Sequence, residues 1–387
     1  MGLIMIHAPA PWSGSGYGQQ CALWAQKFRE MGHEVVISAF WGLAGTPIQW
    51  NGITVLPGFG GQYCSPSLQQ HAKHVGPDLV ITLGDVWVLD PNVLRELPVA
   101  HWLPGDCRPM STADRNVLEA SGGQIIAMSR FGQERFREAG FTSAHYVPHG
   151  ISFETFKPAG DKAELRATRG MDPDAFVVGV NAANNDAIRK AAPEMMLAFA
   201  KFHQSHPDAV LALHTGVHQD GGQDLEAVAE NLGITDRCMV ADQYRYTAGL
   251  ITPGDMADWY NCVGGNGVLL ASTYGEGFGL PIVEAMACGV PVITTRCSSM
   301  EELNPDGIQV EGSPFFNGVH RAWWIRPSPG EIWRALEQAY EQRTDVNPVK
   351  LRDSVTEYEI GVVSEKFMRP TVDALLEHFA AKKAAAA

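Results

Sequence analysis

The chain has 387 residues, of which 45% are hydrophobic and 19% charged, so it can bury sizeable cores and differs from a disordered chain. Its length favours two domains. Acidic residues outnumber basic ones by 43 to 29, and the net charge of −14 argues against binding to nucleic-acid phosphates or acidic lipid. With no apolar run of membrane-spanning length and no basic start typical of a signal peptide, we expect a soluble, cytoplasmic protein.

Short apolar runs alternate with helical patterns along the chain, the order typical of a parallel sheet covered by helices. In the first half we predict a helix over 19–32 and strands over 3–8, 33–40, 79–84, 99–104, 124–129 and 144–150. A polar segment, 157–175, is the predicted linker. Beyond it we predict strands over 176–181, 209–214, 237–240, 267–271 and 290–295, with helices near 189–205, 223–232, 254–262 and 281–288.

These patterns predict an α/β protein with two Rossmann-like domains, over 1–158 and 170–350. In such sheets ligands bind beyond the carboxyl ends of the strands, so the cleft between the domains is the expected active site. The first domain carries a net charge near −2 and the remainder near −12. The first domain is therefore the less repulsive surface for an anionic acceptor.

A glycine-rich turn, Gly14, Gly16 and Gly18, follows the first predicted strand and precedes its helix. Glycines let backbone N–H groups approach an anion, and a helix N-terminus adds partial positive charge. We interpret these glycines as contacts for a donor phosphate or sugar. A tight turn without a ligand is the alternative. An NAD site is less favoured because the spacing departs from G-x-G-x-x-G.

The strongest signal lies at residues 271–295, where a strand ends in a glycine-rich turn between Glu276 and Glu284. Pro281 fits the first turn of the helix that follows, and Glu284 lies one turn inside it. Amides of such a turn can hold a diphosphate while the two carboxylates accept hydrogen bonds from sugar hydroxyls. The alternative is that Glu284 only complements the helix dipole.

Cations that could meet a diphosphate are Arg189 and Lys190, predicted at the start of a helix. A basic pair there opposes the helix dipole, which favours an anionic partner over a solvated helix start. The D-x-D pair, Asp172 and Asp174, is interpreted as a turn in the linker. We therefore expect no metal site.

The segment over 276–293, EGFGLPIVEAMACGVPVI, closely resembles the E-x7-E signature of the large retaining nucleotide-sugar glycosyltransferase family 4, which has the GT-B fold. Four other segments also agree with this family in order and spacing: GSGYG, IIAMSRFGQERFREAGF, YVPHGISFETFKP and RKAAPEMMLAFAKF. The resemblance implies that the second domain binds the donor and the first binds the acceptor. It also implies a C-terminal helix, over about 364–387, that crosses back to the first domain.

By the same resemblance, Glu284 would hold the ribose and Glu276 would contact the donor sugar near the reacting carbon. Diphosphate or sugar would lie on the amides of Gly277, Phe278, Gly279 and Leu280. Two departures stand out. Asn184 and Asn185 occupy the place of a usual arginine, which Arg189 would replace. Ser152 stands where the family usually has an aspartate.

The acceptor side is less defined. Asp106 follows a strand and matches a subgroup that reads Pro-x-Asp, so it is our candidate for orienting or deprotonating the acceptor hydroxyl, or for stabilising positive charge. A loop-capping turn is the alternative. Tyr17, His101 and His149 are further acceptor-side candidates, each with a core role as its alternative.

The sequence thus predicts a metal-independent hexosyltransferase without a cofactor, which moves a sugar from a nucleoside-diphosphate donor to a hydroxyl acceptor with retained configuration. A UDP-sugar is the first expectation and a GDP-sugar the second. A GT-B phosphorylase, a nucleotide-sugar epimerase and a non-catalytic sugar-nucleotide-binding partner are the alternatives. The sequence specifies neither the acceptor nor the oligomeric state.

Overall fold

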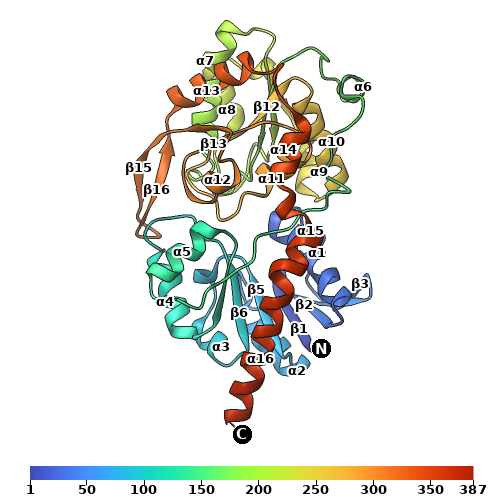
Figure 1. Ribbon diagram of the computed structural model, residues 1–387, viewed down its shortest axis with the longest axis vertical. Helices are drawn as coiled ribbons and strands as arrows, with labels where there is room; N and C mark the ends of the chain where they lie inside the picture. Colours follow the sequence, from blue (N-terminus) through green and yellow to red (C-terminus); the bar gives the residue numbers. More distant parts are fainter. Residues whose placement is uncertain (387) are drawn as a thin grey trace. The chain divides into compact units, whose positions relative to one another are not determined.

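The computed structural model describes residues 1–386, which form two compact units. The first unit contains residues 1–150, 317–322 and the C-terminal segment from Gly361. The second contains residues 151–316 and 323–360. Each unit has its own sheet, with helices packed against it (Figure 1).

The first unit is built on an eight-stranded sheet of order β3-β4-β2-β1-β5-β6-β7-β8. All neighbouring strands are parallel except β3 and β4. Its strands are β1 (Leu3–Pro9), β2 (Glu34–Trp41), β3 (Ile48–Trp50), β4 (Ile53–Leu56), β5 (Leu79–Leu83), β6 (Val99–Leu103), β7 (Gln124–Ala127) and β8 (His145–Tyr146). Its helices before Gly150 are α1 (Gly16–Glu30), α2 (Ser65–Val75), η1 (Val86–Val88), α3 (Pro91–Arg95), α4 (Thr112–Ser121) and α5 (Arg130–Glu138).

The β3–β4 hairpin is a feature that our sequence analysis missed. Its strands pair antiparallel around Asn51 and Gly52, which both have positive φ. Asn-Gly is a strong signal for a two-residue hairpin turn. The strands were overlooked because they are short and β3 is largely exposed.

Apolar side chains of the first sheet pack against one face of α2, α3, α4 and α5. Strand residues of this core include Met5, Val80 and Val99, and helix residues include Leu68 and Leu118. Burial of these side chains fixes the strands in register. The loops at the carboxyl ends of β1, β5 and β6 are thereby held at one edge of the sheet.

The second unit has a six-stranded parallel sheet of order β11-β10-β9-β12-β13-β14 and a separate hairpin, β15–β16. Its strands are β9 (Val177–Asn181), β10 (Val210–His214), β11 (Cys238–Val240), β12 (Gly267–Ala271), β13 (Val292–Thr295), β14 (Ile308–Val310), β15 (Gly312–Asn317) and β16 (Ala322–Pro327). Its helices are α6 (Lys162–Thr168), α7 (Ala192–Ser205), α8 (Leu225–Leu232), η2 (Thr235–Arg237), α9 (Gln243–Thr247), α10 (Pro253–Gly264), α11 (Leu280–Ala287), α12 (Ser298–Leu303), α13 (Pro329–Glu341), α14 (Pro348–Ser354) and η3 (Thr356–Tyr358). The predicted doubly wound α/β character is confirmed in both units.

The predicted linker contains a helix, α6, that is anchored by one arginine. Arg166 is fully buried, and its guanidinium donates to backbone carbonyls of Cys262, Pro173 and Ala175 at 2.6 to 2.9 Å. A buried guanidinium is tolerated only when its donors are satisfied. The segment is therefore an integral part of the second unit.

The C-terminal segment comprises α15 (Ile360–Val363), a π-helical turn η4 (Ser364–Met368) and α16 (Arg369–Ala386). Phe367 packs edge-on against Tyr146, and Leu376 lies beside Gly2. The predicted return of this helix to the first unit is confirmed (Figure 1). Pro370 does not interrupt it, since the proline occupies the start of α16 directly after the π-helical turn.

Within residues 1–386, no helix is both long and apolar enough to cross a bilayer.

Candidate active site

The loop between β12 and α11 carries Glu276, whose carboxylate meets two cations. Lys190 Nζ lies 2.7 Å from Glu276 Oε1, and Arg189 donates to Oε2 at 3.4 Å. The three side chains are 14 to 25% exposed. The loops that follow β9 and β12 supply them because these strands are neighbours with parallel direction. The sequence thus predicted the residues, and the fold brings them together.

The prediction that Arg189 and Lys190 open a helix is wrong. α7 begins at Ala192, after Ala191 with φ 52°. The basic pair lies in the preceding turn, where Asp186 Oδ1 accepts from the amides of Ile188 and Arg189 at 2.8 and 2.9 Å. The predicted conflict with the helix dipole therefore does not arise. Within this unit, Glu276 is an anionic partner of both side chains.

Burial alone would raise the pKa of the Glu276 carboxyl, but the charges of Lys190 and Arg189 outweigh it and hold the pKa below its ordinary value. Glu276 is therefore ionised at neutral pH. The two cations and the carboxylate are packed at low exposure beside the turn that precedes α11.

Two serines that the sequence analysis missed fix the Glu276 loop. Ser298 Oγ accepts from the Glu276 amide at 2.9 Å. Ser299 Oγ donates to the carbonyls of Glu276 and Phe278 at 2.8 and 2.6 Å. Both serines open α12 after β13, so their placement at the end of a neighbouring strand was the available signal.

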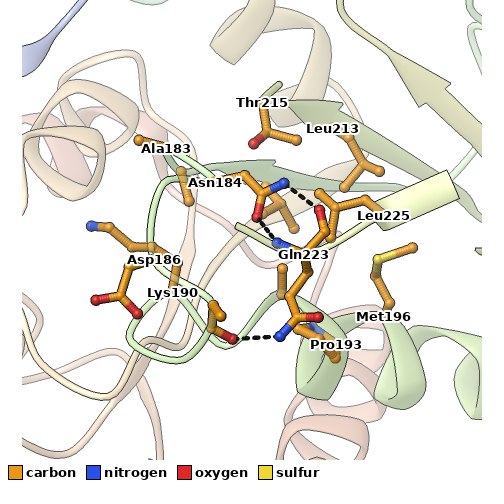
Figure 2. Close-up of a pocket in the computed structure, with 14 residues that line it drawn as sticks. Ala183, Asn184, Asp186, Lys190, Pro193, Met196, Leu213, Thr215, Gln223 and Leu225 are labelled. Atoms are coloured by element: carbon orange, nitrogen blue, oxygen red, sulfur yellow. Dashed lines mark hydrogen bonds between the residues drawn. The ribbon is translucent and has the colours of Figure 1, made fainter. Parts of the chain in front are cut away.

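Asn184, at the position of the family's usual arginine, has a structural role. Its Nδ2 donates to the carbonyls of Gly216 and Gln223 at 3.0 and 2.7 Å, and its Oδ1 accepts from the Gln223 amide at 2.9 Å. Figure 2 shows this amide joining two loops at the wall of a pocket that Lys190 also lines. Asn184 is 4% exposed, and its amide braces the loop that follows β9.

Glu284 lies on α11 and is 6% exposed. Burial raises the pKa of its carboxyl to about 7, although the Tyr260 hydroxyl, which donates to Oε2 at 2.8 Å, acts in the opposite direction. The helix starts at Leu280 after Gly279, whose φ of 106° requires glycine. Gly277, Phe278, Gly279 and Leu280 therefore form the turn and first residue of α11, as the sequence predicted.

In the first unit, Asp106 follows β6 and Asp85 follows the neighbouring strand β5. Their negative charges act on Asp114 of α4. Burial first, and then the charges of Asp85 and Asp106, raise the pKa of Asp114 to about 8. Asp114 Oδ1 is buried without a hydrogen-bond partner in residues 1–386. The acceptor-side candidate Asp106 thus belongs to a group of three carboxyls.

The two histidine candidates lie in the core of the first unit. His101 is fully buried in β6, and its Nδ1 lies 2.8 Å from Thr82 Oγ1. His149 is 2% exposed and packs on Trp102 with ring centroids 4.7 Å apart. Burial lowers the pKa of each imidazole to about 3. These positions favour the core alternative for both.

The glycine turn differs from its predicted position, because α1 begins at Gly16 rather than after Gly18. Ser15 caps the helix by accepting from the Gly18 amide at 3.1 Å. A Cβ on Gly18 would lie 2.1 Å from Ser13 Oγ, so close packing alone requires glycine there. Tyr17 lies on the first turn, 6.4 Å from the His149 ring. A ligand role for Gly14 and Gly16 stays a prediction.

Asp172 and Asp174 form a turn in which Asp172 Oδ1 accepts from the Asp174 amide at 2.9 Å. Within the described part of the chain, no three His, Cys, Asp or Glu side chains are grouped as metal ligands.

Residues 180–358 match the family model described as glycosyl transferases group 1. The D-inositol 3-phosphate glycosyltransferase 1 of Catenulispora acidiphila is 27% identical over 220 residues, or 54% of this chain and 48% of that protein. The lipopolysaccharide core biosynthesis mannosyltransferase LpsB of Rhizobium meliloti is 27% identical over 167 residues, or 43% of this chain and 44% of that protein. The chain therefore spans about half the length of these relatives.

Solved structures resemble the chain over nearly its whole length. Sucrose-phosphate synthase from Thermosynechococcus elongatus matches with a TM-score of 0.74 and 16% identity, covering 98% of this chain and 99% of that one. Anabaena HepE in complex with UDP and glucose matches with a TM-score of 0.68 and 16% identity, covering 97% and 100%. These findings confirm the predicted GT-B fold and the predicted resemblance to family 4-type glycosyltransferases.

The raised pKa of Glu284 predicts that Glu284→Gln stabilises the protein in a pH-dependent way. Because the folded carboxyl has a pKa of about 7 against an ordinary 4.5, the folded state holds this proton more tightly, and stability falls as pH rises between these values. The variant should match the wild type near pH 4.5 and exceed it by about 3 kcal/mol above pH 7. Chemical denaturation across this range is the measurement, and equal stability at pH 8 contradicts it.

Proposed function

We propose that this chain, whose residues 180–358 match the family model of group 1 glycosyl transferases, moves a hexose from a nucleoside-diphosphate donor to a hydroxyl acceptor with retained configuration. The observation that carries the proposal is the Lys190–Glu276–Arg189 cluster beside the N-terminus of α11. Two cations and a turn of amides at one sheet edge suit a diphosphate.

In this proposal the second unit holds the donor. Lys190 and Arg189 bind the diphosphate together with the amides of Gly277, Phe278, Gly279 and Leu280, and Glu284 accepts from ribose hydroxyls. A UDP-sugar is our first choice of donor, supported by the likeness in fold to HepE, which was solved in complex with UDP and glucose. A GDP-sugar is the second. Gly14 and Gly16 are proposed as further donor contacts.

The chemistry requires that the bond between the anomeric carbon and the diphosphate breaks and that the acceptor oxygen forms a bond to that carbon. Lys190 and Arg189 neutralise the charge on the departing diphosphate, so we propose that no metal ion is needed. We assign to Glu276 the stabilisation of positive charge that develops at the anomeric carbon. Asp106 of the first unit is our candidate to take the acceptor proton.

Front-face attack assisted by the leaving phosphate and a covalent intermediate are both compatible with retention. Two other activities give different products. A phosphorylase would use free phosphate as acceptor, and an epimerase would convert the donor without any acceptor. The ionised Glu276 between two cations favours transfer over a non-catalytic binding role, since charge stabilisation at this place serves a reaction.

Although residues 1–158 carry a net charge of only about −2, we propose that the acceptor has no phosphate group. Asp85 and Asp106 are close enough to raise the pKa of Asp114, and further negative charge there would be repelled. On this proposal the acceptor differs from the inositol 3-phosphate in the names of these relatives. We propose a neutral polyol, a sugar or an amine-bearing hydroxyl compound as acceptor.

Pairs of acceptors that differ only in one phosphate group test this charge preference. We expect at least about tenfold higher kcat/KM for the unphosphorylated member, the equivalent of about 1.4 kcal/mol of repulsion. Donor consumption is the measurement. Faster turnover of the phosphorylated member contradicts the proposed acceptor class.

The two glutamates should separate kinetically. Glu284→Ala should chiefly raise the donor KM and weaken free nucleotide binding, because a ribose contact acts equally in ground and transition states. Glu276→Ala should lower kcat by about 100-fold or more while nucleoside-diphosphate affinity stays within about threefold, because its cations remain for the phosphates. Steady-state kinetics and calorimetry measure both, and Glu301→Ala, an exposed glutamate on α12, is the control. The reverse pattern would show that the assignments are exchanged.

A further inference from the structure

A chain of hydrogen bonds in the second unit ends on Glu284. The Tyr260 hydroxyl donates to Glu284 Oε2 at 2.8 Å, and Asn181 Nδ2 lies 2.7 Å from the Tyr260 oxygen. Asn181 Oδ1 lies 3.0 Å from His214 Nδ1. Asn181 and His214 are register partners at the carboxyl ends of β9 and β10, so the sheet itself sets their separation. Tyr260 is fully buried on α10.

The direction of each of these hydrogen bonds follows from which atoms can donate and which can only accept. An amide nitrogen only donates, so Asn181 Nδ2 occupies the Tyr260 oxygen as an acceptor and leaves the hydroxyl hydrogen for Glu284. An amide oxygen only accepts, so His214 Nδ1 carries the proton. Burial lowers the pKa of His214 to about 4, which keeps its ring neutral. All three hydrogen bonds therefore run in one direction, from His214 through Asn181 and Tyr260 to Glu284.

Only one oxygen of Glu284 is used in this way. Within residues 1–386, Oε1 makes no hydrogen bond, whereas Oε2 is held by Tyr260. A carboxylate held at one oxygen presents the other in a fixed direction. We propose that Tyr260 is a positioning residue that aims Glu284 at the donor ribose, with Asn181 and His214 fixing the direction of its hydrogen bond. This inference rests on the proposed function of Glu284.

The surroundings of Glu284 make Tyr260 more than a packing group. Burial raises the pKa of the carboxyl to about 7, and the Tyr260 hydrogen bond is the one interaction in the described chain that lowers it. The charged groups Lys162 of α6 and Arg352 of α14 act on the neighbouring thiol of Cys288 instead. Loss of the hydroxyl would therefore raise the pKa of Glu284 further and leave it less ionised at neutral pH.

An ionised carboxylate accepts stronger hydrogen bonds than a protonated one. Nucleotide affinity should therefore rise with pH as Glu284 loses its proton, around pH 7 in the wild type. Tyr260→Phe should move this rise to higher pH. A purely structural role for Tyr260 would instead weaken binding by the same factor at every pH.

The experiment is calorimetric titration of the full chain with UDP and GDP between pH 5.5 and 9. For Tyr260→Phe we expect a midpoint about one pH unit higher and affinity about three- to tenfold weaker at pH 7, approaching the wild type at pH 9. Asn181→Ala should shift the midpoint less, in the same direction. Tyr340→Phe on α13, whose ring packs against Phe176, Phe202 and His206, is the matched control.

A second readout needs no nucleotide. The stability difference between Glu284 and Glu284→Gln, measured against pH in the wild-type and Tyr260→Phe backgrounds, reports the titration of Glu284 itself. An unchanged midpoint there overturns the inference, whatever the nucleotide does. A shifted midpoint without nucleotide binding overturns the proposed function and leaves the coupling between Tyr260 and Glu284 standing.

Discussion

The second unit depends on one electrostatic constraint, the placement of the Glu276 carboxylate between Lys190 and Arg189. Burying a carboxylate to this extent is costly unless cations lie beside it. Lys190 and Arg189 supply these cations and hold the pKa of Glu276 below its ordinary value. The same contacts tie the loop after β9 to the loop after β12, and Ser298 and Ser299 of α12 complete the frame. An entering diphosphate would meet cations already in place, so little reorganisation would be needed at the moment of reaction.

The two glutamates show how environment divides similar groups between different tasks. Glu276 has cations within 3.4 Å and is firmly ionised, whereas Glu284 has a phenol as its one hydrogen-bond partner among the described residues and titrates near neutrality. Both sit at the same edge of one parallel sheet, where strand ends deliver side chains from distant parts of the sequence. In the proposed mechanism, Glu276 stabilises positive charge at the anomeric carbon and Glu284 binds the donor ribose.

The strands and helices around the site were largely predictable because buried parallel strands appear as short apolar runs. The glycines and the proline between Glu276 and Glu284 likewise predicted a turn followed by a helix. Other features depend on contacts that one sequence does not encode. Ala191 adopts a left-handed conformation that alanine rarely takes, which moved the start of α7 beyond the basic pair. Asn184 and Tyr260 act through partners far along the chain, so neither their bracing nor their positioning role could be read from spacing.

We propose that side-chain cations hold a donor diphosphate beside Glu276. Calorimetric titration of the wild type and Lys190→Ala with UDP and GDP, in excess EDTA, tests it most directly, with exposed Lys350→Ala on α14 as control. Loss of one charge-assisted contact should weaken binding by about 10- to 100-fold while the control binds normally. Binding by the wild type that appears only with added metal, or equal affinity of Lys190→Ala and the wild type, would contradict the claim.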